Sequence, residues 1–263
     1  MISGGDIIVK IRILEIGHKE FKLPRKEGYS RIFVGPEKDE LAKEGDFRDD
    51  NGQNISQMNP YYCELTAIYW AWKNLDEDVL GFAHYRRHFM SSKNQWSFVK
   101  ISEVSKIILE NAIILPKAHQ LFDRTVLEDY GAHHNVGDMK KIRKIIEEKY
   151  PQYTYAFDIV MSRNYYHPYN MFIMHHKELD EYCNFLFDVL KSSEDKINYL
   201  DYNAFDARVF GFISERLLDV WIYAEKKEYY ELPVHMFEKS FSKILLYAGN
   251  FVKRRIGKKG DKI

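Results

Sequence analysis

The sequence contains few cysteines. Cys63 and Cys183 are the two among 263 residues, and they stand far apart in apolar, helix-like surroundings. This number and spacing exclude a disulfide framework and a cysteine zinc motif, and they favour a reducing compartment. No run of about 18 apolar residues occurs that could span a membrane. Residues 1–6 lack the basic and apolar blocks of a signal peptide, so we expect a cytoplasmic protein.

Several motifs of nucleotide, redox and metal enzymes are also missing. The chain has no GxGxxG, GxxxxGKS/T, GxSxG, CxxC or HExxH, which disfavours Rossmann cofactors, P-loop ATPases, α/β-hydrolases, thioredoxin-like sites and zincins. An excess of positive charge is absent as well. Lysine plus arginine and aspartate plus glutamate number 39 each, so the formal net charge is zero. A general nucleic-acid binder is normally basic, so we expect no nucleic-acid partner.

The apolar residues that are present form strand-like runs separated by amphipathic segments. The expected strands are residues 7–16, 29–34, 79–83, 112–115 and 171–174. The expected helices are one beginning at residue 59, and residues 102–110, 138–149, 153–163, 179–190 and 203–224. This alternation predicts an α/β fold, with α/β/α layers around a mostly parallel central sheet. We expect residues 1–238 to form one domain.

The most informative stretch follows the predicted strand at residues 79–83. The apolar run changes abruptly into the basic, aromatic sequence His84-Tyr85-Arg86-Arg87-His88. Open α/β sheets bind ligands at the carboxyl ends of their strands, and guanidinium groups suit a diphosphate. The alternative is structural: Arg86 and Arg87 would pair with carboxylates, and His84 would be a satisfied core histidine.

Polar segments elsewhere carry further candidates. His18 and Lys19 follow the first strand after Gly17, where they could meet a phosphate or lie in an ordinary turn. Residues 45–56 are turn-forming and contain Asp49, Asp50 and Asn54. They lack the carboxylate spacing of a calcium loop, so we expect hydrogen bonds to sugar hydroxyls or a solvated loop.

The middle of the chain combines a clear helix start with a loose segment. Asn59-Pro60 is a favourable helix N-terminus, and Glu64 lies on the helix that follows. Residues 117–135 show no clear periodicity, which predicts a loop. The polar candidates of this segment and of the later turn are His133, His134, Asn135, His167 and Asn170. Neither His133 nor His134 has a metal-ligand spacing.

The predicted helix at residues 203–224 has two faces. Arg208, Gly211, Glu215 and Asp219 gather opposite an apolar stripe. A glycine inside a helix costs about 1 kcal/mol relative to alanine, which room for a ligand could offset. The alternative is a solvent-exposed face with ion pairs of little energetic value.

The C-terminal residues 239–263 differ in composition from the rest of the chain. They carry eight lysine or arginine side chains against a single acidic one, Asp261, with aromatic and aliphatic residues between them. This composition predicts a basic amphipathic segment that anchors the protein on a membrane surface. The alternative is a basic tail that follows a core helix.

Taken together, six stretches resemble a bacterial galactofuranosyltransferase family of capsule, exopolysaccharide and O-antigen synthesis. They are residues 17–19 (GHK), 49–56 (DDNGQNIS), 59–74 (NPYYCELTAIYWAWKN), 84–87 (HYRR), 171–174 (MFIM) and 208–218 (RVFGFISERLL). One departure is Gly17, where a threonine is expected. The resemblance implies a GT-A-like fold that transfers galactofuranose from a UDP donor to a lipid-linked glycan at the inner face of the cell membrane, with inversion.

The candidate residues can be given roles in such a transfer. Inversion needs a carboxylate base on the acceptor hydroxyl, for which Glu215 is the first choice and Asp201 the second, and the resemblance itself assigns neither. Donor binding is expected of His18, Lys19, Asp49, Asp50, Asn54, Glu64, His84, Tyr85, Arg86, Arg87 and Arg208. Acceptor binding is expected of His133, His134, Asn135, His167, Asn170 and Gly211.

Cofactor use and two other functions stay open. GT-A enzymes commonly carry Asp-x-Asp at a strand end to hold a metal on the diphosphate, and His84-Tyr85-Arg86 occupies that place here. No cofactor is therefore assigned, and a divalent metal stays an alternative. The rival functions are a metal-dependent hydrolase that uses the histidine-rich segment and a non-catalytic glycan- or lipid-binding partner of a polysaccharide polymerase.

Overall fold

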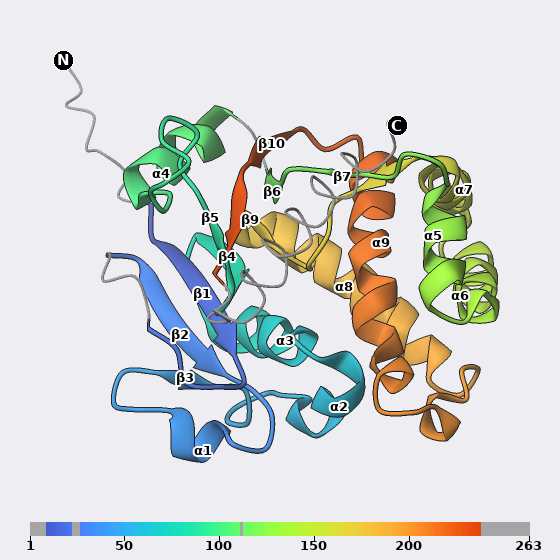
Figure 1. The fold of residues 1–263 in the computed structure, drawn as a ribbon, viewed down its shortest axis with the longest axis horizontal. Coiled ribbons are helices and arrows are strands. Elements are labelled where there is room, and N and C mark those ends of the chain that lie inside the picture. The colour runs from blue at the N-terminus through green and yellow to red at the C-terminus, as the bar shows by residue number, and fades with distance from the viewer. Residues whose placement is uncertain (1–8, 23–26, 111–112, 238–263) are drawn as a thin grey trace, which may run out of the picture.

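The computed structural model describes residues 9–22, 27–110 and 113–237. Its centre is a twisted sheet in the order β10-β6-β9-β4-β1-β2-β3 (Figure 1). The β1–β4, β1–β2, β2–β3 and β6–β10 pairs are parallel, whereas β9 runs antiparallel to both of its neighbours. The α/β prediction with a mostly parallel central sheet is therefore confirmed.

The strands are short, and two of them leave the main order of the sheet. Strand β5 pairs with the end of β4, and β11 pairs with β5. A separate two-stranded sheet joins β7 to β8. The bounds are β1 (Ile11–Gly17), β2 (Tyr29–Phe33), β3 (Phe47–Arg48), β4 (Val79–His84), β5 (Arg87–Phe89), β6 (Ile113–Pro116), β7 (His119–Gln120), β8 (Tyr165–Tyr166), β9 (Phe172–His175), β10 (Tyr229–Leu232) and β11 (Val234–Met236).

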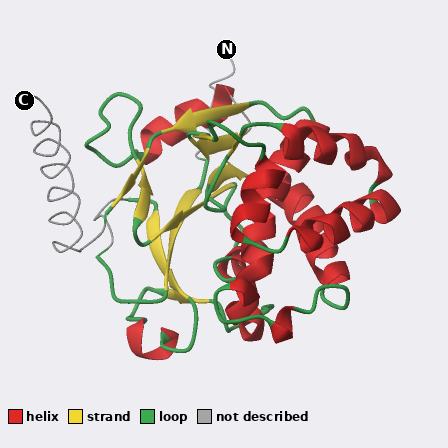
Figure 2. Ribbon diagram, turned by 45° about the vertical axis from the view of Figure 1, so that its right-hand side comes forward, coloured by secondary structure: helices red, strands yellow, loops and turns green. Residues whose placement is uncertain are grey.

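Most helices gather on one side of the sheet (Figure 2). The α-helices are α1 (Lys38–Leu41), α2 (Asn59–Tyr62), α3 (Leu65–Asn74), α4 (Ile101–Glu110), α5 (Val126–His133), α6 (Val136–Lys149), α7 (Thr154–Ser162), α8 (His176–Ser193) and α9 (Val209–Ala224). Single 3₁₀ turns lie at η1 (Ser56–Met58), η2 (Pro151–Tyr153), η3 (Tyr199–Asp201) and η4 (Asp206–Arg208).

Side chains of the central strands alternate between two cores, as the period of a strand requires. On β4, Leu80 and Phe82 join the larger core with α3, α8 and α9, whereas Val79 and Ala83 join a smaller core with α4. All four side chains are buried. Helices therefore cover both faces of β4, which explains its continuous apolar sequence.

The register of the sheet brings several connections to one edge. In the parallel pairs, Ile16 lies beside His84 and Gly17 beside Phe33, so β1, β2 and β4 end together. Strand β9 is antiparallel, and its first residue, Phe172, pairs with Phe82. The turn before β9 therefore reaches the same edge as the segments that follow β1 and β4.

Three element predictions need correction. The helix predicted from Asn59 is divided into α2 and α3 at Cys63, which has φ of 53°. The helix predicted from residue 203 begins as an α-helix at Val209, after η4. The predicted loop at residues 117–135 contains α5, which begins with a capping box of Thr125 and Glu128. That capping box was the sequence signal that could have revealed the helix.

The predicted membrane segment, residues 239–263, lies outside the described residues. Among residues 9–22, 27–110 and 113–237, no helix combines the length and the apolar character that a membrane crossing requires.

Candidate active site

A pocket of ≈ 710 Å³ opens at the carboxyl edge of β1 and β4. Its volume lies within the usual range for small-molecule sites. The lining comes from the ends of β1 and β4, from α2 and the residues after it, from the turn before β9, and from the start of α9. Its polar and aromatic members are His18, Asn59, Cys63, Glu64, His84, Tyr85, Arg86, Arg87, Tyr169, Arg208, Phe212 and Glu215.

Three arginines line this pocket without a carboxylate partner. Within the described part of the chain, Arg86, Arg87 and Arg208 make no ion pair, in contrast to the paired arginines elsewhere on the surface. The Nε atom of Arg87 is buried and has no hydrogen-bond partner among the described residues. Unpaired guanidinium groups at a pocket are suited to binding an anion, above all a phosphate. The alternative in which Arg86 and Arg87 pair with carboxylates is not observed.

Arg86 lies in a tight turn, and Arg87 is the first residue of β5. His84 pairs with Arg87 across the β4–β5 ladder, so Tyr85 and Arg86 form the turn between the two strands. The guanidinium of Arg86 lies 5.0 Å from the centre of the Tyr85 ring, and that of Arg87 lies 4.3 Å from the Tyr169 ring. Contacts of this kind orient an arginine without neutralising it.

His84 lies in the pocket as a neutral ring. Burial lowers its pKa, and the nearby arginines add to this effect against the charge of Glu64. Its Nε2 lies 2.7 Å from the carbonyl oxygen of Tyr169. A carbonyl can only accept, so Nε2 carries the proton and Nδ1 is left as an acceptor. The imidazole therefore offers hydrogen bonding, and the positive charge comes from the arginines.

Glu215 supplies a carboxylate to the same pocket. Its Oε1 accepts the backbone N–H of Tyr169 at 3.1 Å, and its Oε2 accepts Nη1 of Arg216 at 2.8 Å. Burial raises its pKa, and the charge of Glu64 raises it further, against the effects of Arg216 and the Tyr169 amide. A fixed carboxylate with a raised pKa has the properties of a general base.

The turn before β9 holds the two carboxylates in place. Tyr169 and Asn170 both have left-handed backbone conformations, with φ of 80° and 51°. Asn170 Nδ2 donates to Oε1 of Glu64 at 2.8 Å and to the carbonyl of Gly211 at 3.1 Å. Its Oδ1 accepts the hydroxyl of Ser214 at 2.9 Å. Left-handed residues other than glycine are uncommon and tend to cluster at functional sites.

A further left-handed residue, Cys63, lies across the pocket. Its Sγ accepts Nε of Arg208 at 3.2 Å. Burial raises the pKa of the thiol to about 11, so it is protonated at neutral pH. A Cβ atom on Gly211 would lie 3.5 Å from Cys63, an ordinary van der Waals contact, so the packing of α9 on α2 does not itself require glycine here. The sequence did not single out Tyr169 or Cys63 as site residues, because nothing local predicts a left-handed conformation for either.

The segment after β1 completes one wall. His18 lines the pocket and its ring contacts Tyr85 edge-on, with 5.2 Å between ring centres. Burial lowers the pKa of His18, followed by the positive charges of Lys19, Arg86 and Arg208. Lys19 itself is exposed and does not line the pocket. A Cβ atom on Gly17 would collide with the Phe21 ring, which accounts for glycine at this position.

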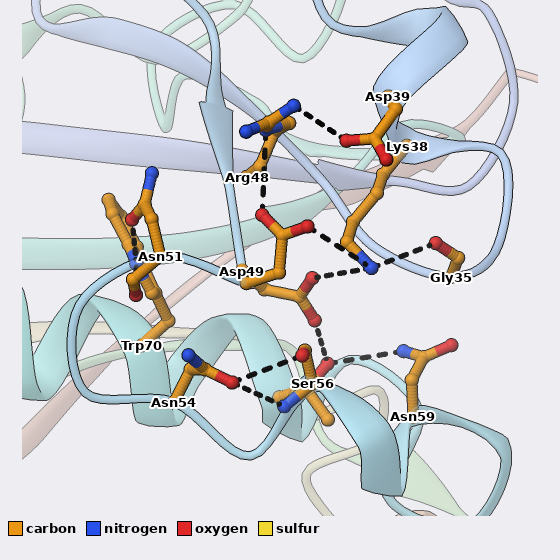
Figure 3. Close-up of polar contacts among 12 residues, drawn as sticks. Gly35, Lys38, Asp39, Arg48, Asp49, Asn51, Asn54, Ser56, Asn59 and Trp70 are labelled. Carbon is orange, nitrogen blue, oxygen red and sulfur yellow. Dashed lines mark hydrogen bonds and ion pairs between the residues drawn. The ribbon is translucent and has the colours of Figure 1, made fainter.

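Asp49, Asp50 and Asn54 do not line the pocket. Figure 3 shows the polar contacts that they make instead. Asp49 is buried and accepts the hydroxyl of Thr66 at 2.6 Å. Asp50 lies 3.6 Å from Nζ of Lys38. Asn54 accepts the backbone N–H of Ser56 at 3.2 Å. The hydroxyl of Thr66 in turn accepts Nδ2 of Asn59, a lining residue. These polar side chains thus contact other residues of the protein. Asp49 is connected to the pocket lining through Thr66 and Asn59.

The histidine-rich segment lies beside the pocket. His134 stacks on Phe212, a lining residue, with 4.0 Å between ring centres. Burial lowers the pKa of His134 to about 4, so its ring is neutral. His133 is exposed and contacts the carbonyl of Asp129. Asn135 caps α6 by accepting the N–H of Gly137. None of these three residues lines the pocket itself.

Three further polar residues lie apart from the pocket. His167 is buried, with Nδ1 at 2.6 Å from Asp219 and Nε2 at 3.0 Å from Glu231. Both ring nitrogens are occupied, so neither is left for an acceptor. Asp219 is also buried, which corrects the polar, ligand-facing position expected for it on α9. Asp201 is exposed on η3 and does not line the pocket.

No metal centre is formed by the described residues. Among residues 9–22, 27–110 and 113–237, no group of three His, Cys, Asp or Glu side chains lies close enough to hold a metal ion. The described residues of the histidine-rich segment, 117–135, are therefore not part of any such group.

Residues 12–227 match the model of a family described as a domain of unknown function, DUF4422. The chain belongs to the DUF4422 family. A comparison with curated proteins finds no match.

Among solved structures, the chain is similar to a bifunctional glycosyltransferase, WbbM, in its apo form. The TM-score is 0.74 with 27% sequence identity over 88% of this chain. The matched region is 46% of the WbbM chain, so the present chain spans about half of that length. The similarity supports the GT-A-like fold that the sequence resemblance implied for this DUF4422 chain.

Proposed function

We propose that this DUF4422 chain is an inverting glycosyltransferase that moves galactofuranose from a UDP donor to a lipid-linked glycan. The observation that carries the proposal is that unpaired guanidinium groups and a half-buried carboxylate, that of Glu215, line one pocket at the carboxyl edge of β1 and β4. The similarity to WbbM agrees with this reaction class. The choice of galactofuranose rests on the resemblance of the sequence motifs.

In this proposal the donor diphosphate lies against Arg86, Arg87 and Arg208. Their positive charge stabilises the negative charge that develops on the leaving diphosphate, a role that a metal ion serves in other enzymes. His18 and Tyr85 form the neighbouring wall, where they contact the nucleotide. His84 offers Nδ1 as an acceptor to a donor hydroxyl.

Glu215 is the proposed base. Its carboxylate takes the proton of the acceptor hydroxyl, whose oxygen attacks the anomeric carbon of the donor sugar. The bond between that carbon and the phosphate oxygen breaks, and its electron pair leaves with UDP. Glu64, held by Asn170, faces the same pocket and binds sugar hydroxyls. Attack opposite the leaving group inverts the anomeric centre.

The acceptor enters beside α9 in this proposal. Gly211 and Phe212 line that side of the pocket, and His134 stacks behind Phe212. An aromatic ring at this position suits the apolar face of a sugar. Attachment of residues 239–263 to the cytoplasmic face of the membrane would bring the pocket to a lipid-linked substrate.

The test is UDP release from UDP-galactofuranose, UDP-galactose and UDP-glucose, each with and without a lipid-linked galactoside. We expect acceptor-dependent release with UDP-galactofuranose that persists in EDTA, because arginines supply the positive charge. Binding of UDP without consumption of any donor would contradict the proposal and favour the non-catalytic alternative. Loss of transfer in EDTA, restored by a divalent ion, would contradict the proposed role of the arginines.

A further inference from the structure

A second cavity of ≈ 530 Å³ is lined by residues of α7, the C-terminal half of α9 and the beginning of β10. Its size also falls within the range of ligand sites. Four tyrosines and one arginine dominate its lining, namely Tyr155, Arg163, Tyr165, Tyr223 and Tyr229. The proposed transfer reaction uses none of these residues.

The side chains of this second cavity are arranged around Arg163. Its guanidinium lies 5.3 Å from the centre of the Tyr165 ring and 4.7 Å from that of Tyr223. Tyr155 lies beside Tyr223, with 6.4 Å between ring centres. Tyr155 is 68% exposed and Tyr229 is 38% exposed, so aromatic surface is open to solvent.

The polar groups of these five side chains have no partner in the described part of the chain. Neither the guanidinium of Arg163 nor any of the four phenol hydroxyls makes a hydrogen bond or ion pair with residues 9–22, 27–110 or 113–237. In contrast, Lys227 in the same lining is neutralised by Glu181 at 2.6 Å. Donors, acceptors and open aromatic faces thus occur together at one concave surface.

This combination fits a saccharide. The apolar face of a sugar ring packs on an aromatic side chain, while phenol and guanidinium groups bond to its hydroxyls. A diphosphate would instead require several free cations close together, as in the first pocket. Here the tyrosine rings enclose the guanidinium of Arg163, the charge of Lys227 is neutralised, and Lys226 is an exposed further cation of the lining, so the free positive charge is smaller than that of the three arginines in the first pocket.

The two cavities lie along the same face of α9. Glu215 lines the first, Asp219 and Tyr223 line the second, and these positions follow the i, i+4, i+8 spacing of one helix face. Eight residues of helix separate Glu215 from Tyr223, which corresponds to about 12 Å.

One chain segment also joins the two cavities. Tyr165 lines the second cavity, the N–H of His167 donates to Asp219 at 2.8 Å, and the N–H of Tyr169 donates to Glu215 in the first. The segment from residue 165 to residue 169 therefore runs along the same face of α9 and connects the walls of both sites.

We propose that the second cavity binds a sugar unit of the glycan acceptor that lies away from the point of transfer. The identity of the ligand as an acceptor glycan rests on the proposed function, whereas the saccharide class follows from the lining. A longer acceptor would then bind more tightly than a single sugar, because it contacts both cavities.

The test is an NMR titration of the full chain with galactose and with a galactose tetrasaccharide, with UDP present to occupy the donor part of the first pocket beside the arginines. We expect the tetrasaccharide to bind more tightly than galactose. Tyr155→Ala and Arg163→Ala should each weaken tetrasaccharide binding about tenfold, as expected for loss of one stacking or charged hydrogen-bonding contact. The matched control is Tyr230→Ala, because Tyr230 is also 38% exposed on β10 and does not line the cavity.

Equal tetrasaccharide affinity in wild type, Tyr155→Ala and Arg163→Ala would overturn the proposal, as would no detectable binding by the wild type. UDP affinity should be the same in all four proteins, which reports that each variant is folded. Because binding is measured without a sugar donor, this result does not depend on turnover. Tetrasaccharide binding without any transfer activity would contradict the proposed function and leave the second site supported.

Discussion

The backbone N–H of Tyr169 donates a hydrogen bond to Oε1 of Glu215 at 3.1 Å, while the carbonyl of the same residue accepts Nε2 of His84 at 2.7 Å. One left-handed residue therefore connects the carboxylate of α9 to the end of β4. The proposed base and the basic turn are held in a fixed relation by the backbone, without direct contact between their side chains.

Replacement of Glu215 by glutamine tests the proposed base. Glu215→Gln preserves shape and removes basicity, so we expect transfer to slow by ~10²–10⁴-fold with UDP affinity unchanged. The matched control is Asp201→Asn, because Asp201 is exposed and lies outside the pocket. Slow transfer by Asp201→Asn with normal transfer by Glu215→Gln would move the base to Asp201.

The pH dependence of transfer provides a second test of Glu215. Burial raises its pKa above that of an ordinary carboxyl group, and a base acts only when deprotonated. We therefore expect kcat/KM to fall as pH decreases through this raised pKa, on the acid side of the profile. A flat profile down to the range of an unperturbed glutamate, about 4.3, would contradict the assignment.

Asn170 provides a test of the left-handed turn. Both Asn170→Gly and Asn170→Ala remove its hydrogen bonds to Glu64, Gly211 and Ser214, which we expect to lower the free energy of unfolding by about 2 kcal/mol. Alanine should cost about 1 kcal/mol more than glycine, because φ is 51°. Urea unfolding measures both values. Equal stability of the two variants would show that the left-handed backbone is not maintained.

The buried pair of His167 and Asp219 predicts a pH dependence of stability. Burial alone lowers the pKa of His167, but the hydrogen bonds and charges of Asp219 and Glu231 outweigh it, so the pKa is raised. The folded state then binds the proton more tightly than the unfolded state. The stabilisation is complete below the unfolded pKa of about 6.5 and is lost as pH rises through the folded pKa.

The variant His167→Gln isolates this effect. We expect the stability difference between wild type and His167→Gln to shrink as pH rises from about 6.5, as measured by urea unfolding across that range. A difference that grows with pH would mean that the folded protein favours the neutral imidazole.

The sequence predicted the elements of the pocket better than their connections. The apolar run of β4 predicted a buried strand, and the basic residues after it necessarily lie at its carboxyl end. Helical periodicity likewise placed Arg208, Gly211 and Glu215 on one face of the predicted helix, and all three line the pocket, although Arg208 belongs to η4 and precedes α9.

What the sequence could not indicate were contacts between distant segments and unusual backbone conformations. The sequence predicted that His167 and Asp219 face a ligand. In the structure they bond to each other, although they lie 52 residues apart in the sequence. Asp49 was predicted to lie in a loop as a sugar-binding or solvated residue. In the structure it is fully buried and bonds to Thr66. Tyr169 and Cys63 carry no local signal for positive φ, because each is a type that rarely adopts it.

Calorimetric titration of UDP tests the central claim most directly, that the unpaired arginines at the end of β4 bind the donor diphosphate. We predict that Arg86→Ala and Arg87→Ala each weaken UDP binding by roughly ten- to a hundredfold, because a charge-assisted hydrogen bond contributes ~1.5–3 kcal/mol. The control Arg124→Ala removes an exposed arginine that is paired with Asp123 and should bind UDP as the wild type does. UDP affinity unchanged in folded Arg86→Ala and Arg87→Ala would contradict the account.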